Sequence, residues 1–560
     1  ELEWELIPGL SLSGNAGYRH YNRSQKDFVA EVRFDENKVY GPNRLNIDNE
    51  FISLLQLQAL ARYDKKIEEH SIGGVLGFSQ EEYRQEWYTG YRQNFPNNSL
   101  HELDAGSKNG MSNSGSAQEY ALRSFFGRIN YSFKDRYLVE VNARYDGTSR
   151  FPKNNRWGVF PSASLGWRMS EEDFVKDNIH WIDNLKLRVS WGQLGNQNIG
   201  YYPYQSVLSN QNYAFGGTVA SGLATTRYVN KNISWETTTV TDVGVDFSIL
   251  NGLWDVTLDY FVKKTSDILY STTASAVLGL SPSESNSADV SNKGFEILLS
   301  YKPHIGNVNL GISPNFSYVK NRVEKLGGGI TADYGKSLYV GHPINSIYGY
   351  VADGLFVDND DIKNYSTQPY SAQPGFVRYK DLDGDNITDP ANDRKVLGST
   401  TPKFTYGLTL TADYKSFDFM ILLQGLGGHK QRLGSYQGYA LYNSGQIQRW
   451  QADNRWTEEN PDRDAIYPKL TSLNDNAGTI MTSTYWLRDA SFLRAKNIQL
   501  GYSIPKGVLE DFKITQLRIF FSGQNVFCIN SSYPGWDPEI SSGNFYPITA
   551  TYTFGLSLKF

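Results

Sequence analysis

Residues 548–560 alternate strictly between apolar and polar side chains. Ile548, Ala550, Tyr552 and every second residue up to Phe560 are apolar, with threonine, glycine, serine or lysine between them. A period of two is typical of a β-strand with one apolar face. At about 3.3 Å per residue the segment is longer than most soluble strands and matches the roughly 9–11 tilted residues that cross a bilayer. Taken alone, it predicts either a membrane-crossing strand or an edge strand of a soluble sandwich.

The same alternation recurs in hairpins that are joined by short turns. These turns are expected near residues 8, 65, 134, 251, 304 and 415, and the Asn251-Gly252 pair is the strongest turn signal among them. In the strand after Asn251-Gly252, we expect the apolar residues to face lipid and the polar residues to face the lumen. The apolar set is Val256, Leu258 and Tyr260, and the polar set is Asp255, Thr257 and Asp259.

Counted in this way, the chain contains about sixteen complete strands and a partial one at its start. Short connections alternate with long ones, which are expected at 21–49, 81–119, 195–236, 265–291, 321–402, 428–489 and 528–545. Short periplasmic turns and long external loops are the rule for bacterial outer-membrane barrels. A soluble sheet rarely reaches this many strands without splitting. The predicted fold class is therefore all-β, a transmembrane antiparallel β-barrel with long extracellular loops and short periplasmic turns.

Composition supports a barrel over a helical membrane protein. Tyr, Phe and Trp make up 14% of residues, there are 51 glycines, and the mean hydropathy is -0.48. The densest apolar run, residues 419–423, is far shorter than the roughly 18 residues of a spanning helix. A polar average is compatible with a barrel, because only every second side chain of its strands meets lipid. Aromatic residues such as Tyr406 and Tyr414 stand at strand ends, where they suit the headgroup zone.

Charge and motifs exclude several other functions. A net charge of -5 without a basic stripe argues against nucleic acid as a partner. The single cysteine, Cys528, permits no internal disulfide, and the seven histidines show no zinc spacing. Nucleophile elbows, His-Glu-x-x-His motifs and phosphate-binding glycine loops are absent from the sequence. We therefore expect no enzyme activity and no required cofactor.

Several segments, taken in order, resemble the SusC/RagA-type TonB-dependent transporters of the Bacteroidetes outer membrane. The similar segments are 142–167, 185–188, 191–197, 235–237, 264–270, 381–385, 486–489, 497–502 and 533–539, together with the terminal Phe560. Each is weak alone, but their order along nearly the whole chain makes the resemblance specific.

The resemblance implies a barrel of about 22 strands, plugged by an N-terminal domain and covered by a SusD-like surface lipoprotein. It also implies a TonB-binding segment. Residues 1–560 contain neither the plug nor that segment, so we expect them to be the C-terminal part of one barrel domain, with the plug and the first strands upstream. The implied function is active import of a large nutrient, an oligosaccharide or an oligopeptide. A passive porin or a surface-adhesion barrel is the alternative.

One acidic segment in the 321–402 loop has the spacing of a metal site. Asp381, Asp383, Asp385 and Asp389 could supply carboxylates, and Ile387 a backbone carbonyl, in the oxygen-rich pattern that Ca²⁺ prefers. The glutamate that usually closes such a loop is replaced by asparagine. A solvated acidic turn is therefore the alternative to a calcium site.

Loop composition leaves the substrate open. Segments 81–119 and 198–229 hold tyrosines among Asn, Gln and Ser, which suits stacking on sugars or the polar face of a partner lipoprotein. These tyrosines are Tyr88, Tyr91, Tyr201, Tyr202, Tyr204 and Tyr213. No residue can be assigned to substrate binding from the sequence.

Overall fold

The computed structural model describes residues 2–271, 277, 279–472, 478–509, 514–530, 533–534, 536–540 and 546–560. The chain divides into two compact units. The first unit comprises Glu1–Trp167, Ser190–Val240 and Thr265–Ala288, and the second comprises Arg168–Val189, Thr241–Lys264 and Asp289–Phe560. Among the described residues, no helix has the length and apolar character needed to cross a membrane.

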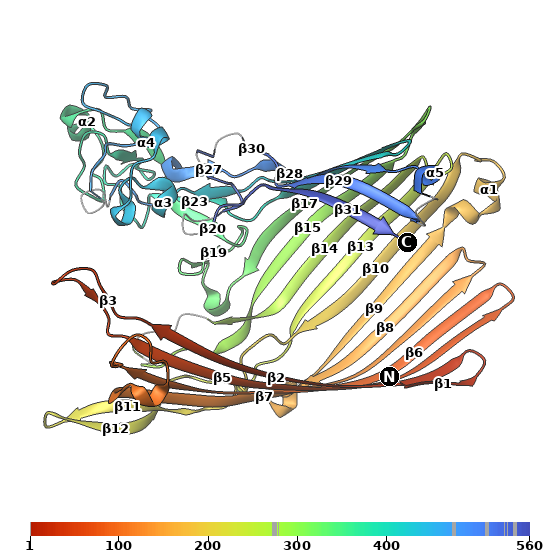
Figure 1. Ribbon diagram of the computed structural model, residues 1–560, viewed down its shortest axis with the longest axis horizontal. Helices are drawn as coiled ribbons and strands as arrows, with labels where there is room; N and C mark the ends of the chain where they lie inside the picture. The colour runs from red at the N-terminus through yellow and green to blue at the C-terminus, as the bar shows by residue number, and fades with distance from the viewer. Residues whose placement is uncertain are drawn as a thin grey trace. The chain divides into compact units, whose positions relative to one another are not determined.

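Seven strands form the sheet of the first unit (Figure 1). They are β1 (Leu2–Ile7), β2 (Leu10–Val29), β5 (Arg44–Ile67), β6 (His70–Gln93), β7 (Ser107–Phe133), β8 (Tyr137–Thr148) and β9 (Trp157–Arg168). Each pairs antiparallel with the next of the seven. Only the last residue of β9 falls outside this unit. Two short hairpins lie in the connections of this unit, β3 (Val32–Arg33) with β4 (Val39–Tyr40) and β11 (Leu208–Phe215) with β12 (Thr218–Thr225). The sheet is therefore an up-and-down meander.

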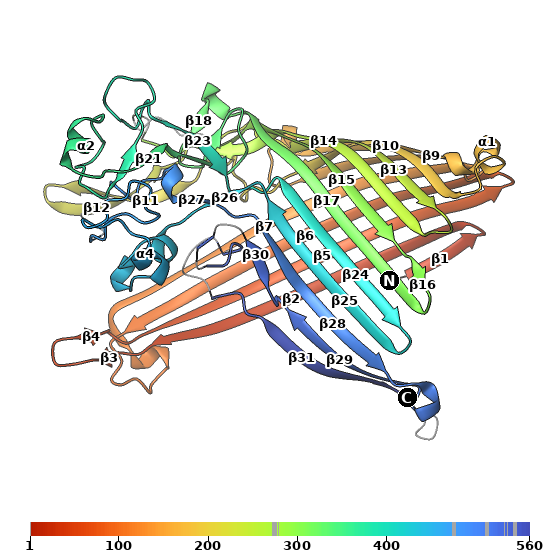
Figure 2. The same ribbon diagram turned by 90° about the horizontal axis from the view of Figure 1, so that it is seen from above.

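The second unit continues the same meander pattern, and its long strands lie side by side in Figure 2. Its strands are β16 (His304–Ile305), β17 (Val308–Lys325), β24 (Phe404–Tyr414), β25 (Phe417–Gly427), β28 (Phe492–Ser503), β29 (Gln516–Gln524), β30 (Cys528–Asn530) and β31 (Thr551–Lys559). Pairing is antiparallel throughout. Four further strands have residues in both units, β10 (Ile182–Asn196), β13 (Glu236–Ile249), β14 (Trp254–Ser271) and β15 (Glu284–Tyr301).

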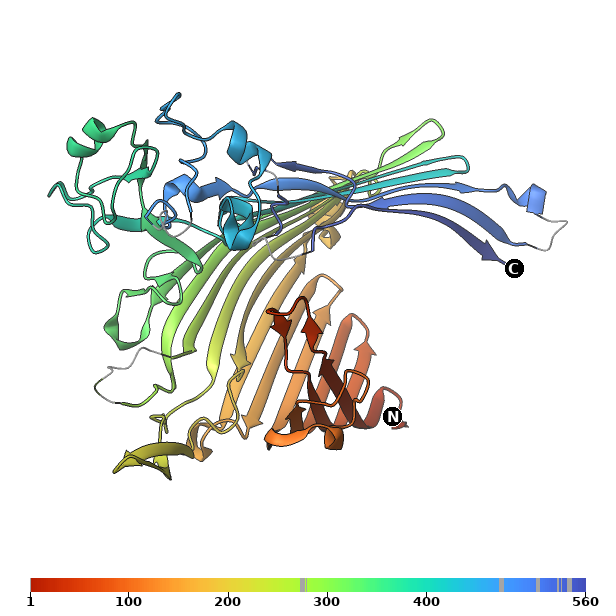
Figure 3. The ribbon, with the colours of Figure 1, turned by 60° about the vertical axis from the view of Figure 1, so that its left-hand side comes forward.

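At one end of the second unit's strands, the long connections fold into a packed region of short elements (Figure 3). Its strands are β18 (Ala332–Asp333), β19 (Leu338–Tyr339), β20 (Ser346–Tyr350), β21 (Ala352–Leu355), β22 (Val377–Tyr379), β23 (Arg394–Ser399), β26 (Lys430–Arg432) and β27 (Leu487–Asp489), and its helices are α2 (Asn359–Lys363), α3 (Ser435–Gly438) and α4 (Arg449–Asp453). Trp486, Tyr467 and Leu433 form one core, and Tyr379 and Trp456 belong to another. These loops are therefore folded structures in their own right. The helices α1 (Asp173–Lys176) and α5 (Lys506–Leu509) are single turns elsewhere.

The short turns lie where the sequence predicts them, with one shift. Lys134 and Asp135 both take positive φ between β7 and β8, as do Asn251 and Gly252 between β13 and β14. This left-handed backbone matches the twist of tight hairpins. The turn expected near residue 65 lies three residues later, after β5 ends at Ile67.

The strand count agrees with the prediction, whereas the loop boundaries do not. Among the described residues, the antiparallel meander has seventeen strands when the two- and three-residue strands β16 and β30 are left out. The sequence predicted about sixteen complete strands and one partial strand, which is the same number. The predicted loop at 81–119 is wrong over most of its length, because β6 extends to Gln93 and β7 begins at Ser107. The loop predicted at 21–49 is also shorter in the structure, because β2 extends to Val29 and β5 begins at Arg44. Conversely, the last strand is shorter than predicted and begins at Thr551.

Candidate functional site

An apolar band crosses one side of the sheet in the first unit, and two rows of aromatic rings border it. We call this side the band face and the opposite side the inner face. The row nearer the short turns contains His70, Tyr131, Phe133 and Tyr137, with ring centroids 4.9–6.4 Å apart for the contacts between neighbours. The other row contains Phe78, Phe125, Tyr145 and Trp157, with centroids 4.6–6.3 Å apart. Two such girdles are what a barrel presents to the two interfaces of a membrane.

Between the girdles, the exposed residues of the band face are apolar. Leu76 is 71% exposed, Ile129 64% and Val141 50%. Along β7, Ile129 stands four residues from Phe125 and four from Phe133. The band between the two rows is therefore about 27 Å long measured along the strand, and about 20 Å deep at a 40° tilt. This depth fits the hydrocarbon layer of an outer membrane.

The strands of the second unit carry a charged cluster on one face. In the second unit, the Arg188 guanidinium of β10 donates to Asp246 of β13 at 2.8 and 3.0 Å and to Asp259 of β14 at 2.9 Å. The Thr257 hydroxyl donates to Asp246 at 3.3 Å. Leu258 is 43% exposed on the other side of the strand. This confirms that Asp259 and Thr257 share one face of β14, while Leu258 lies on the other.

Beyond the second girdle, the strands of the first unit continue and carry an aromatic cluster on the inner face. The rings of Tyr83 and Tyr120 stack with centroids 5.1 Å apart, and Tyr120 and Tyr201 stack at 6.0 Å. The Arg150 guanidinium lies over the rings of Tyr120 and Tyr201, at 4.6 and 4.8 Å. The Tyr120 hydroxyl donates to Glu81 at 2.7 Å. Stacked rings, a cation and a carboxylate can bind a polar solute by stacking and by hydrogen bonds.

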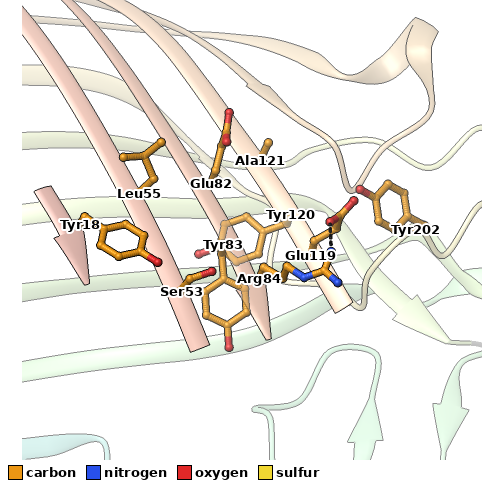
Figure 4. A pocket seen from close by; sticks show the side chains of 10 residues that line it. All are labelled: Tyr18, Ser53, Leu55, Glu82, Tyr83, Arg84, Glu119, Tyr120, Ala121 and Tyr202. Carbon is orange, nitrogen blue, oxygen red and sulfur yellow. Dashed lines mark ion pairs between the residues drawn. The ribbon is translucent and has the colours of Figure 1, made fainter. Parts of the chain in front are cut away.

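A pocket of about 420 Å³ lies in the same part of the first unit, and Figure 4 shows its side chains. Its residues are Tyr18, Ser53, Leu55, Glu82, Tyr83, Arg84, Glu119, Tyr120, Ala121 and Tyr202. Arg84 pairs with Glu119 at 3.5 Å, the ion pair drawn in Figure 4, and also with Glu86. Since Glu82 and Arg84 alternate with Tyr83, most of this lining belongs to the band face of the projecting strands. Tyr83 and Tyr120 of the inner-face cluster also border this pocket.

The acidic segment lies between β22 and β23, and three of its aspartates converge. One carboxylate oxygen from each of Asp381, Asp383 and Asp385 lies within 4.8 Å of the others. The backbone N–H groups of Gly384 and Asn386 donate to Asp381, both at 2.7 Å. Hydrogen bonds from the Gly384 N–H group lower the pKa of Asp381, whereas partial desolvation and the neighbouring Asp385 carboxylate raise the pKa of Asp383. Three hard oxygen donors in this arrangement suit Ca²⁺.

Asp389 lies outside this convergence, and its place in the predicted ligand set stays a prediction. Its carboxylate caps the next turn by accepting from the backbone N–H groups of Ala391 and Asn392, at 2.7 and 2.9 Å. The backbone N–H of Asp389 donates to the fully buried Asp393 at 2.7 Å. The sequence pattern cannot distinguish a cap from a ligand. Ile387 is exposed, and a role for its carbonyl stays a prediction.

Among the six loop tyrosines, only two contribute to the features described above. Tyr201 joins the inner-face cluster, and Tyr202 lines the pocket of Figure 4. Tyr88 lies on a strand and is 51% exposed. Tyr91 donates to Gln93 on its own strand, Tyr204 packs against a small core around Phe151, and Tyr213 pairs with Phe215. Sequence reasoning missed Arg150, Glu81 and Arg188, whose partners are distant in the sequence.

Comparison with known proteins identifies the family. Residues 1–526 match the family described as TonB dependent receptor-like, beta-barrel. TonB-dependent receptor P3 of Formosa agariphila is 30% identical over 100% of this chain and 57% of its own length, and TonB-dependent receptor SusC of Bacteroides thetaiotaomicron is 29% identical over 100% and 55%. The solved RagAB peptide transporter has a TM-score of 0.84 at 24% identity, covering 99% of this chain and 60% of that one.

The chain belongs to the TonB-dependent receptor β-barrel family. Its membership confirms the outer membrane as its location and the SusC/RagA resemblance found in the sequence. Proteins of this family are receptors rather than enzymes, as expected. The chain spans a little over half the length of the curated relatives it matches. In this setting the band face meets lipid, the short turns are periplasmic and the long connections are extracellular.

Proposed function

We propose that the chain forms the barrel wall of an energy-coupled importer for a large polar solute. Family membership over residues 1–526 is the observation that carries this proposal. The polar side chains of the strands agree with it, because the second unit presents ion pairs such as Arg188 with Asp246 and the first unit presents stacked aromatic rings. A wall of this kind can bind a hydrated solute weakly at many points along its path.

The aromatic cluster is the part of the wall that we assign to solute binding. Tyr83, Tyr120 and Tyr201 offer ring faces at one level of the projecting strands, and Arg150 and Glu81 add opposite charges beside them. Sugar rings stack on such tyrosines, and peptide backbones and side chains use the same rings and charges. An oligosaccharide or an oligopeptide is therefore the proposed substrate.

We also propose two protein partners. A SusD-like lipoprotein would cover the extracellular end, where the packed loops around Trp486 and Tyr379 provide a preformed docking surface. The TonB complex would supply energy through the N-terminal part of the full-length protein. Folded loops support a stable partner, because a preformed surface loses little conformational entropy on binding.

Solute uptake by cells that express the full-length transporter tests the assignment. Fluorescent oligosaccharides and oligopeptides of graded length are supplied, and the half-saturating concentration is measured for Tyr120→Ala. Loss of one stacking ring should raise that concentration roughly 2- to 10-fold for the true substrate class. Tyr88→Ala is the matched control, since this tyrosine lies on the band face of the same sheet and is 51% exposed. Equal effects of the two substitutions would contradict the assignment.

A further inference from the structure

A second pocket lies on the band face directly beyond the extracellular aromatic girdle. Its volume is about 250 Å³, and its lining belongs wholly to the first unit. The lining residues are Gln80, Glu82, Ala121, Leu122, Arg123, Gly147, Thr148, Ser149, Arg156 and Trp157. Trp157 is also a member of the girdle, where its ring stacks on Tyr145. The pocket therefore begins where the hydrocarbon layer ends, at the depth of lipid headgroups.

Two arginines in this pocket have no acidic partner among the described residues. Arg123 donates through Nε to the Gln80 side chain at 3.0 Å. It forms no ion pair with any acidic residue that the structure describes. The Nε of Arg156 is buried and finds no hydrogen-bond partner within the described ranges. The one acid of the lining is Glu82, which accepts from the amide of Gln80. By contrast, Arg84 in the next row is held by Glu86 and Glu119.

Two guanidinium groups line this pocket without an acidic partner among the described residues, so its positive charge is uncompensated. A ligand of this pocket must carry acceptor oxygens and negative charge, because guanidinium groups are donors only. Phosphate oxygens meet both requirements and suit the fork of an arginine. Solutes on the transport path do not reach this pocket, because it opens on the band face.

Below the girdle, the band face has a groove that fits a hydrocarbon chain. Its volume is about 490 Å³, and it also lies wholly in the first unit. Small residues form its floor, namely Ala61, Gly74, Gly127 and Ala143, and larger apolar ones form its sides, namely Tyr63, Leu76, Ile129 and Val141. On β7 the groove begins at Gly127, four residues from Arg123. This spacing is about 13 Å along the strand, so pocket and groove can hold one lipid molecule.

We propose that Arg123 and Arg156 bind the phosphate headgroup of an outer-leaflet lipid, whose acyl chain lies in the groove of small residues below. The girdle rings Phe125 and Tyr145 would pack against the region between headgroup and chain. Such a lipid would fix the depth of the barrel wall in the membrane, because the phosphate and the chain are held at the two sides of one girdle. The site is separate from solute transport and from the acidic loop.

Native mass spectrometry of the full-length transporter, delipidated in detergent, tests the site. The probes are monophosphorylated lipid A and the same lipid with its phosphate removed. Each arginine near an anionic headgroup should contribute about fivefold in affinity. The unmodified protein should therefore bind the phosphorylated probe at least fivefold more tightly, and the double variant R123Q/R156Q should bind both probes equally. The variant R33Q/K38Q removes two charges from the exposed β3–β4 hairpin and should keep the preference.

Two further measurements separate the parts of the site. Gly74→Leu should partly fill the groove, since an added Cβ at this position would meet only the Arg128 carbonyl oxygen, at 3.8 Å. This substitution should weaken the binding of both lipid probes to a similar extent. Folding of each variant is checked by its heat-dependent shift in gel mobility. Three results would overturn the proposal, namely equal binding of both probes by the unmodified protein, a retained preference in R123Q/R156Q, or displacement of the lipid by inorganic phosphate alone.

Discussion

Placing an arginine at the middle of the apolar band provides a quantitative test of how the sheet sits in the membrane. Ile129 is 64% exposed on the band face, and its cross-strand neighbours are Gly74 and Val141. The two girdle residues of its own strand, Phe125 and Phe133, are each four residues away. Four residues span about 13 Å, or about 10 Å of depth at a 40° tilt, so Ile129 lies at the midplane.

An arginine on the lipid face at this depth costs about 2–4 kcal/mol. Ile129→Arg should therefore lower the folding equilibrium constant roughly 30- to 900-fold. Val159 lies on the same face in the row of Phe125 and Tyr145, so an arginine there should cost only about 0–1 kcal/mol. Asn130→Arg places the same charge on the inner face, beside Glu140 across the strand pair, and should have little effect.

The assay is a urea titration of the full-length barrel folding reversibly into phospholipid vesicles, followed by tryptophan fluorescence and gel mobility. The expected order of destabilisation is Ile129→Arg, then Val159→Arg, then Asn130→Arg. Equal losses for Ile129→Arg and Asn130→Arg would refute the division into two faces. A larger loss for Val159→Arg than for Ile129→Arg would refute the assigned depth.

Three further experiments test individual features. Arg188→Gln should destabilise the barrel by about 1–3 kcal/mol in the same titration, because it leaves Asp246 and Asp259 without their cation. Gly9→Ala should cost more than Gly252→Ala, since both glycines have positive φ but only at Gly9 would the new Cβ meet a carbonyl oxygen, at 2.3 Å. D383N/D385N should abolish the protection that calcium gives the acidic loop against protease. In the unmodified protein, the raised pKa of Asp383 means that this carboxylate takes up its proton at a pH above the ordinary range of aspartate. Protection by calcium should therefore be lost as the pH falls through that higher value. Protection that is equal with calcium and with chelator would leave only a solvated turn.

The part of the fold that could be predicted from the sequence is the part set by local rules. Tight turns such as Asn251-Gly252 and Lys134-Asp135 can be recognised in the sequence, because few residues tolerate positive φ. Alternation is equally local wherever one face meets lipid and the other meets water. Both signals are readable within a dozen residues, and the hairpins they define agree with the structure.

Alternation fails where the strands leave the membrane. Along β6, Gln80, Glu82 and Arg84 on one face alternate with Glu81 and Gln85 on the other, so both faces are polar. No period of two in hydrophobicity remains there, although backbone pairing with β5 and β7 continues. This explains why 81–119 was predicted to be a loop, although most of it is strand.

The candidate sites also differ in whether their residues lie close together in the sequence. The three converging aspartates lie within five residues of one another, so their spacing could be recognised. The stacking of Tyr120 on Tyr201 and the pairing of Arg188 with Asp259 join residues 81 and 71 positions apart. Such contacts depend on strand register, which is set by the whole sheet. Asp389 shows the limit of spacing even for local motifs, because its carboxylate caps a turn.

Energy coupling is the central claim, and uptake in the presence and absence of a protonophore tests it most directly. Cells that express the full-length transporter are loaded with the substrate identified in the uptake assay, and initial rates are compared with those of cells lacking TonB. We expect uptake to fall to the background level in both conditions, because an energy-coupled importer stops when its energy input is removed. Uptake that continues unchanged without TonB and without a proton gradient would contradict the account and identify the barrel as a passive porin.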